Sequence, residues 1–517
     1  MRISLAFAAL LGALPFLFAE HRAPLPSFYD EWLGAALGTL AVTAFLLGKP
    51  SGESALPDLT VWLVLFAAWL GLQALLRPPA YAQLPLAGIA YVLLAAQLAW
   101  LGRALADRHG AERVADVLAW AILAGAGVNA AIGIVQFYGV PRVLGEFIAT
   151  SAGSRVVGHV GQANLLADYV ALGQASLLYL VARERIRGGW WWGVAALLVL
   201  ASACAQSRSA ILFSLWIGAA AFCLRDQGPQ WRRLARQAGV LAAATLAAMV
   251  AIPRLHGTAE RLLDAQLILA EPRTALWALA WRLFAESPWL GVGWGEFAGA
   301  AFSAGLPHAG VWTSPHNLFL QLAAEAGLIG AALILVAALR WSRGAWRDLR
   351  SAATLPLWWV AAVVGTIGLH ALLEYPLWYA HVLGLAAFVA GIASRTRFTV
   401  PAAPLRGGLA AMSAVAFALL AWTLVDYQRF DRACVIAGGR TLAAPAEVSA
   451  AVDELRAVAR GPLGAQVAPW LYQSLPPGEV SVDMGERVLR RWPSPLVVAR
   501  HAAALASARR GVPPPSR

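Results

Sequence analysis

Residues 59–76 read LTVWLVLFAAWLGLQALL, an apolar run without a charged side chain. About 20 such residues are enough for an α-helix to cross the hydrocarbon core of a bilayer. Backbone groups in lipid must form their hydrogen bonds internally, so a helix is the expected structure. The stretch therefore predicts a transmembrane helix.

The same pattern recurs over most of the 517 residues, of which 60% are hydrophobic and 13% are charged. Soluble domains carry about 25% charged residues, so this deficit indicates a chain surrounded mostly by lipid. The other predicted spans are 3–19, 32–48, 85–102, 114–138, 164–182, 190–206, 209–224, 237–253, 317–339, 355–373, 376–393 and 407–425. The sequence predicts an all-α fold: a polytopic integral membrane helical bundle of about 12–13 transmembrane helices.

The first run resembles a signal peptide, but Glu20-His21-Arg22 stands where a cleavage site of small residues would be needed. We expect it to remain as an uncleaved helix. With the N-terminus in the cytoplasm, arginine clusters fall in alternate loops, as the positive-inside rule requires. This orientation places the connector 139–163, the long loop 254–316 and the tail on the periplasmic side of an inner membrane.

The tail is rich in alanine and has helical spacing of apolar residues. We therefore expect a transmembrane domain over residues 1–425 and a small periplasmic helical domain over residues 426–517. The net charge of +12 comes almost entirely from arginines in short loops, which favours anionic membrane lipids over nucleic acid as partners. The three cysteines are scattered and predict neither a disulfide framework nor a zinc site.

Ser314-Pro315-His316-Asn317 ends the long loop and precedes an apolar run. Ser314 is a suitable helix cap, and Pro315 suits the first helical position. His316 would then lie in the first turn, where the helix dipole favours a neutral imidazole that can accept a proton from a hydroxyl group. The alternative is an interfacial histidine that only hydrogen-bonds the loop.

Three arginines on the expected outer side are candidates for binding phosphate. Arg208 lies at the tip of a tight hairpin, Arg273 in the long loop and Arg155 in the connector. Guanidinium groups bind phosphate oxygens in pairs, so together these residues suit a lipid pyrophosphate. Each one alone is better explained by snorkelling or by contact with lipid headgroups, and the phosphate site is expected from the set.

Polar residues in or beside predicted spans are costly in lipid and mark candidate functional sites. We expect substrate binding from Gln162 and Asn164, from Asn317, Gln321 and Glu325 at helical spacing, from Glu374 and Tyr375, and from Arg155. His370 lies four residues before Glu374, but two ligands are too few to predict a metal site. The run Gly291-Val292-Gly293-Trp294-Gly295 lacks nucleotide-loop spacing and predicts a turn at the membrane surface.

Several segments, taken in order, resemble the O-antigen ligase and polymerase superfamily. They are QSRS (206–209), Arg273 with Trp277, SPWLGVGWGEF (287–297), HNLFL (316–320) and EAGLIG (325–330). GHVGQANLLA (158–167) and LEYPLWY (373–379) resemble one branch, the bacterial protein O-oligosaccharyltransferases that glycosylate pilins and other exported proteins.

This resemblance implies that a glycan moves en bloc from undecaprenyl pyrophosphate to a Ser or Thr hydroxyl of an exported protein, without a metal or other cofactor. Arg208 and Arg273 would hold the pyrophosphate, and His316 would activate the acceptor hydroxyl. The alternatives are an O-antigen ligase that uses lipid A-core as acceptor, or an O-antigen polymerase. A transporter or flippase is a remote alternative, since its polar sites should lie near the membrane midplane.

Overall fold

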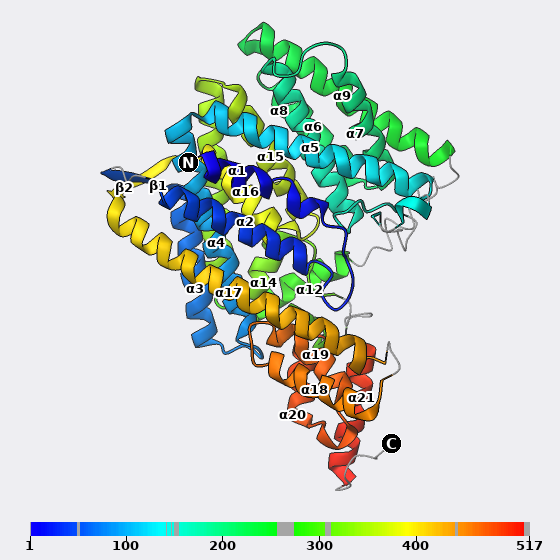
Figure 1. The fold of residues 1–517 in the computed structure, drawn as a ribbon. Helices are drawn as coiled ribbons and strands as arrows, with labels where there is room; N and C mark the ends of the chain where they lie inside the picture. The colour runs from blue at the N-terminus through cyan, green and yellow to red at the C-terminus, as the bar shows by residue number, and fades with distance from the viewer. Residues whose placement is uncertain are drawn as a thin grey trace. The chain divides into compact units, whose positions relative to one another are not determined.

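The computed structural model describes residues 2–48, 52–140, 142–145, 147–148, 155–255, 273–305, 312–439 and 443–510. Over these ranges the chain is almost entirely helical (Figure 1). The exception in the described part is an antiparallel pair of strands, β1 (Glu53–Pro57) and β2 (Thr396–Pro401).

Each predicted span coincides with a helix. The helices are α1 (Arg2–Leu11) with the 3-10 turn η1 (Leu14–Leu17), α2 (Phe28–Leu46), α3 (Asp58–Leu76), α4 (Gln83–His109), α5 (Ala111–Tyr138), α6 (Ala163–Ala182), α7 (Trp191–Ala205), α8 (Ser209–Phe222), α9 (Pro229–Leu255), α14 (Leu318–Ser351), α15 (Leu355–Ala371), α16 (Ala380–Ile392) and α17 (Ala402–Ala437). Among the described helices, eight are long and apolar enough to cross a membrane, and α1, α7, α15 and α16 are shorter apolar helices. The prediction of a polytopic membrane helical bundle is confirmed.

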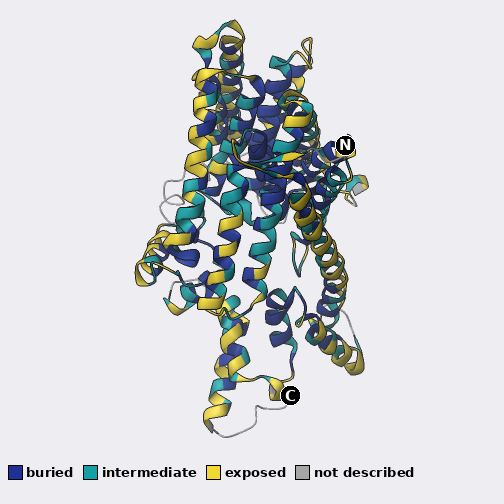
Figure 2. Cartoon of the chain, turned by 90° about the vertical axis from the view of Figure 1, so that its left-hand side faces the viewer, coloured by how far each residue is buried: buried dark blue, intermediate teal, exposed yellow. Residues whose placement is uncertain are grey.

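The long helices differ in how far the protein buries them. In α6, 89% of the apolar 18-residue stretch is buried inside the protein, whereas in α17 only 11% of the corresponding stretch is buried. Figure 2 shows exposed residues spread along long helices rather than confined to loops. Exposed apolar side chains such as Val415 and Trp422 on α17 are therefore expected to face lipid.

The chain divides into two compact units. The first contains Met1–Trp62, Leu94–Glu271 and Ala337–Ser413. Its core is built around α6, which packs against α5, α7, α8 and α15. Tyr169 of α6 stacks on Phe16, and Trp359 of α15 donates a hydrogen bond to Ser176. The indole and phenol groups thus have partners inside the apolar core.

The second unit contains Leu63–Leu93, Pro272–Val336 and Ala414–Arg517. It includes α12 (Arg273–Glu286), α13 (Phe297–Ser303) and the tail helices α18 (Pro445–Val458), α19 (Gly464–Ser474), α20 (Val482–Arg491) and α21 (Pro495–Arg510). The tail is therefore helical, as predicted. The domain boundary expected near residue 425 stays a prediction, and α17 runs through this position without a break.

The tail packs directly on α13 within this unit. Arg490 of α20 donates to the buried carboxylate of Glu296 over 2.8 Å, and a Cβ atom at Gly299 would lie 2.6 Å from the Cα of Arg490. Desolvation lowers the pKa of the neighbouring Arg491, while Glu325 and Glu296 act in the opposite direction. The tail thus contributes positive charge beside the segment that precedes α13.

Candidate functional site

In the first unit, Asn164 is the centre of a hydrogen-bond network. Its side-chain oxygen accepts bonds from Arg155 Nη2 over 2.8 Å and from Ser207 Oγ over 2.9 Å. Its amide nitrogen donates to Glu374 Oε1 over 2.8 Å. The fold therefore brings together three of the predicted site residues, Arg155, Asn164 and Glu374, and anchors Ser207 beside Arg208.

The loop before α6 is held by polar side chains of α5. The backbone N–H groups of Val157 and Gly158 donate to Gln136 Oε1 over 3.1 and 2.9 Å, and that of His159 donates to Asn129 Oδ1 over 2.8 Å. Gly158 has φ of 60°, and a Cβ atom there would lie 2.8 Å from Asn129 Oδ1. The glycine is required by both its conformation and this close approach.

The remaining predicted residues of this unit lie on the edges of the same network. Gln162 is half-buried and precedes α6, and its carbonyl accepts from Leu166 N–H. Arg208 is exposed and precedes α8, after a left-handed Gln206 with φ of 49° that ends α7. Tyr375 is half-buried, follows Glu374 directly and lies with its ring 6.1 Å from that of Tyr379.

One turn further along α6, Asp168 faces His370 of α15, with Oδ2 and Nδ1 separated by 3.0 Å. Both side chains are buried. His370 and Glu374, the pair considered as metal ligands, therefore have different partners. Groups of three or more potential ligands are absent from the described ranges.

In the second unit, the predicted start of the helix after the long loop is wrong. The helix α14 begins at Leu318, and the Asn317 side chain accepts a hydrogen bond from Leu320 N–H over 3.1 Å. Asn317, rather than Ser314, therefore caps the helix. His316 lies before the helix in the left-handed region, with φ of 55°, and its N–H donates to Ser314 Oγ over 3.0 Å. A residue in that conformation cannot belong to the first turn.

His316 is half-buried in a segment fixed by two tryptophans. Trp277 Nε1 donates to the carbonyl of Pro315 over 2.9 Å, and the Trp312 ring lies edge-on to the His316 ring at 5.5 Å. Trp277 lies one turn after Arg273, the first residue of α12. The structure thus brings the start of α12 and the His316 segment together. Residues 256–272 and 306–311 of the long loop lie outside the described ranges.

An apolar cavity of about 290 Å³ runs between α12 and α14. It is lined by Ala280, Trp281, Phe284, Phe319, Leu320, Ala323, Leu328, Ala331, Ala332 and Leu335. Trp281 and Phe284 come from the same helix as Arg273. This arrangement places an aromatic and aliphatic surface along the helix that begins with a candidate phosphate-binding residue.

The glycine-rich run packs against a break in α14. Gly327 has φ of 68° and interrupts the helix, which allows Val292 N–H to donate to the carbonyl of Ala324 over 2.7 Å and Leu328 N–H to that of Pro288 over 2.7 Å. A Cβ atom at Gly327 would lie 2.3 Å from the Trp289 carbonyl oxygen. Gly327 and the glycine-rich run 291–295 therefore form one backbone-to-backbone contact, as expected for a turn rather than a nucleotide-binding loop.

Glu325 and Gln321 are buried on α14, as the polar spacing predicts. Glu325 Oε1 accepts from the backbone of Phe297 over 3.1 Å, and its carboxylate also hydrogen-bonds Gln321 and the backbone of Gly295. These contacts hold the glycine-rich run against α14, and substrate binding by Glu325 and Gln321 stays a prediction.

Two residues of this contact were not singled out from the sequence. Gln73 on α3 donates to the carbonyls of Leu290 and Glu325 over 2.5 and 2.6 Å, and Arg77 donates to that of Gly291 over 2.8 Å. They supply hydrogen-bond partners for one carbonyl at the break in α14 and for two carbonyls at the start of the glycine-rich run that packs there. Gln73 is the one amide side chain in the apolar run 59–76, which was the available signal.

Two parts of the chain match known protein families. Residues 193–335 match the family model described as O-antigen ligase, and this range includes Arg208, Arg273 and His316. Residues 358–510 match a second model, described as virulence factor membrane-bound polymerase, C-terminal. The chain is also 26% identical over 415 residues to a general O-oligosaccharyltransferase from Acinetobacter baylyi, which covers 75% of this chain and 69% of the relative.

The first family model covers the α7–α8 hairpin, the interlocked glycine-rich run and the His316 segment. The polytopic helical architecture fits an enzyme whose donor is carried by a lipid. The chain is a multi-pass membrane protein that belongs to the O-antigen ligase family of glycosyltransferases, which transfer a glycan from a lipid-linked donor to an acceptor.

Proposed function

We propose that this enzyme transfers a glycan en bloc from undecaprenyl pyrophosphate to Ser or Thr hydroxyls of exported proteins such as pilins. The reaction takes place at the periplasmic face of the bacterial inner membrane. The choice of a protein as acceptor rests on the hydrogen bond between Asn164 and Glu374. It joins the two segments that resemble the protein-glycosylating branch. The name of the Acinetobacter relative supports the same choice.

In the proposed reaction, the acceptor oxygen attacks the anomeric carbon of the donor sugar, and the bond from that carbon to the pyrophosphate oxygen breaks. His316 takes the proton of the hydroxyl group. Arg208 and Arg273 bind the pyrophosphate and stabilise the charge that develops on it as it leaves. The products are the glycosylated acceptor and undecaprenyl pyrophosphate, so atoms and charge balance without a cofactor.

The apolar cavity between α12 and α14 supports the lipid-linked donor. Arg273 begins α12, and Trp281 lies two turns further along it in the cavity wall. Eight residues of helix extend about 12 Å, which is long enough to separate a charged headgroup from the start of an isoprenoid chain. We assign the phosphate end to Arg273 and the isoprenoid end to the cavity.

The test is glycan transfer in cells that make one defined lipid-linked glycan. Wild type and His316→Ala are compared by blotting a candidate pilin-like protein and the lipopolysaccharide. Glycan on the protein that disappears in the variant is the expected result. His109→Ala is the matched control, because His109 lies at the end of α4 and is not part of the proposed site.

Glycan found only on lipopolysaccharide would overturn the protein acceptor and favour the O-antigen ligase reaction. Long glycan chains on the lipid carrier, without transfer to either acceptor, would instead favour the polymerase, the activity named in the second family model. Normal protein glycosylation by His316→Ala would remove His316 from the mechanism.

A further inference from the structure

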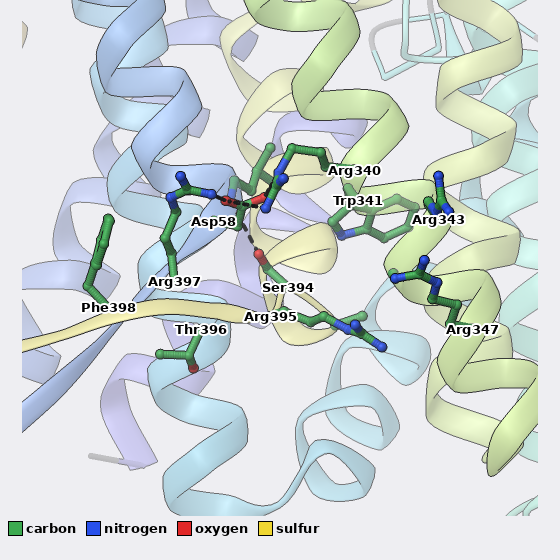
Figure 3. A pocket seen from close by; sticks show the side chains of 13 residues that line it. Asp58, Arg340, Trp341, Arg343, Arg347, Ser394, Arg395, Thr396, Arg397 and Phe398 are labelled. Carbon is green, nitrogen blue, oxygen red and sulfur yellow. Dashed lines mark hydrogen bonds and ion pairs between the residues drawn. The ribbon is translucent and has the colours of Figure 1, made fainter.

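The first unit contains an arginine-rich cavity of about 600 Å³ that the proposed reaction does not use (Figure 3). Three separate segments line it: the start of α3, the last part of α14 and the turn from α16 into β2. The lining includes five arginines, Arg340, Arg343, Arg347, Arg395 and Arg397, but one carboxylate, that of Asp58.

The acidic groups at the cavity neutralise part of this charge. Asp58 accepts from Arg340 over 2.8 Å and from Arg397 over 3.1 Å, and Asp348 pairs with Arg395. Five guanidinium groups thus face two carboxylates, which leaves three positive charges. Within the described part of the chain, Arg343 and Arg347 have no acidic partner, and both are exposed.

The side chains around the cavity separate into two groups in Figure 3. Asp58 lies with Arg340 and Arg397, whereas Arg343 and Arg347 lie on the other side of the cavity. The surplus charge is therefore concentrated on one side, where a ligand can reach it.

The cavity lies where apolar helices begin or end. Asp58 is the first residue of α3, and residues 393–398 follow directly on α16. Trp341 is fixed there by a hydrogen bond from Nε1 to the Ala390 carbonyl over 2.9 Å, and Phe398 is half exposed. Aromatic rings beside arginines at the ends of membrane helices are typical of the headgroup level of a bilayer.

We propose that this cavity binds the phosphate-bearing headgroup of an anionic phospholipid, whose acyl chains extend along the apolar helices. Guanidinium groups bind phosphate oxygens in pairs, and basic pockets between membrane helices are suited to such headgroups. By the orientation predicted from the arginine distribution, this end of α14 faces the cytoplasmic leaflet, so the ligand is distinct from the glycan donor. The proposal does not depend on the acceptor of the transfer reaction.

The experiment uses full-length protein that has been purified in detergent and stripped of lipid. Short-chain phosphatidylglycerol, cardiolipin and phosphatidylcholine are added, and bound lipid is measured by native mass spectrometry. The test variant is Arg343→Gln/Arg347→Gln, which removes the two arginines without acidic partners. Arg232→Gln/Arg233→Gln on α9 is the control, because it removes the same charge from exposed positions elsewhere.

We expect wild type to retain the anionic lipids in preference to phosphatidylcholine, and the test variant to bind them about tenfold more weakly. The control variant should bind like wild type. Arg343→Lys/Arg347→Lys should restore most of the binding, which would exclude misfolding as the cause of the loss.

Two results would overturn the proposal. One is equal retention of anionic lipid by wild type and Arg343→Gln/Arg347→Gln. The other is tight binding of inorganic tripolyphosphate, lost in the test variant, together with no preference among lipids. That second result would assign the cavity to a soluble polyphosphate instead.

Discussion

Asn164 donates a hydrogen bond to Glu374 over 2.8 Å and thereby connects two segments that are 210 residues apart in the chain. Asn164 is half-buried and also accepts bonds from Arg155 and Ser207, so its amide has partners on both sides. This residue fixes the loop before α6, the α7–α8 hairpin and the segment after α15 relative to one another. The connection reaches Ser207, the residue that directly precedes the exposed Arg208.

Replacing Glu374 by alanine should therefore impair transfer without removing any proposed catalytic group. The variant leaves the half-buried Asn164 amide without its acceptor, so the loss should be close to the net value of one hydrogen bond, about 0.5–1.5 kcal/mol. We expect reduced glycan transfer and a lower unfolding temperature in detergent. Glu374→Gln keeps an oxygen acceptor and should retain most of both. A Glu374→Ala enzyme that equals wild type in rate and unfolding temperature would show that the connection is dispensable.

A second prediction concerns the buried pair formed by Asp168 of α6 and His370 of α15. Asp168→Ala leaves His370 Nδ1 without its acceptor inside the helical core, so the free energy of unfolding should fall by about 1–3 kcal/mol. Asp107→Ala is the matched control, because it removes an exposed partner of Arg103 that contributes about 0.3–0.5 kcal/mol. Thermal unfolding of both variants in detergent is the measurement. Equal small shifts would contradict a structural role for the Asp168–His370 pair.

The sequence predicted the membrane helices well because a span depends on local composition alone. The run 59–76 already contains what makes α3 helical in lipid. The start of α14 was mispredicted because the sequence contains two suitable caps, Ser314 and Asn317. Only the left-handed conformation of His316 selects the second.

The partners of the candidate residues could not be predicted, since they depend on contacts between distant segments. The spacing of His370 and Glu374 placed both on one helical face but was too little to predict a metal site, and it did not show that Asp168 and Asn164 face them from another helix. The break at Gly327 likewise has no local cause in its own helix. It exists because the run that contains Trp289 packs there. The roles of Arg208, Arg273 and His316 stay predictions.

The third prediction follows from that break. In Gly327→Ala the added methyl group would lie 2.3 Å from the Trp289 carbonyl oxygen, which is a steric clash. The φ of residue 327 is 68°, a conformation that alanine adopts only with strain. We expect loss of transfer and rapid proteolysis near the glycine-rich run. Gly239→Ala on α9 is the control, because nothing lies within 4 Å of its Cβ position and alanine favours a helix. Normal activity of Gly327→Ala would show that the loop accommodates a shifted α14.

The fourth prediction tests the proposed pyrophosphate site through Arg273. If this guanidinium group stabilises the leaving pyrophosphate, Arg273→Ala should lower turnover by about 10²-fold, the effect of removing one donor from a preorganised charge-stabilising site. Arg273→Lys should recover part of the rate, because a point charge replaces the bidentate fork.

Arg282→Ala on the same helix removes an exposed arginine that lies 3.9 Å from Glu286, and it should leave turnover unchanged. The measurement is the initial rate of transfer by purified enzyme from a lipid-linked donor. Wild-type turnover of Arg273→Ala would exclude Arg273 from leaving-group stabilisation, whereas equal losses in Arg273→Ala and Arg282→Ala would indicate a general requirement for an intact α12.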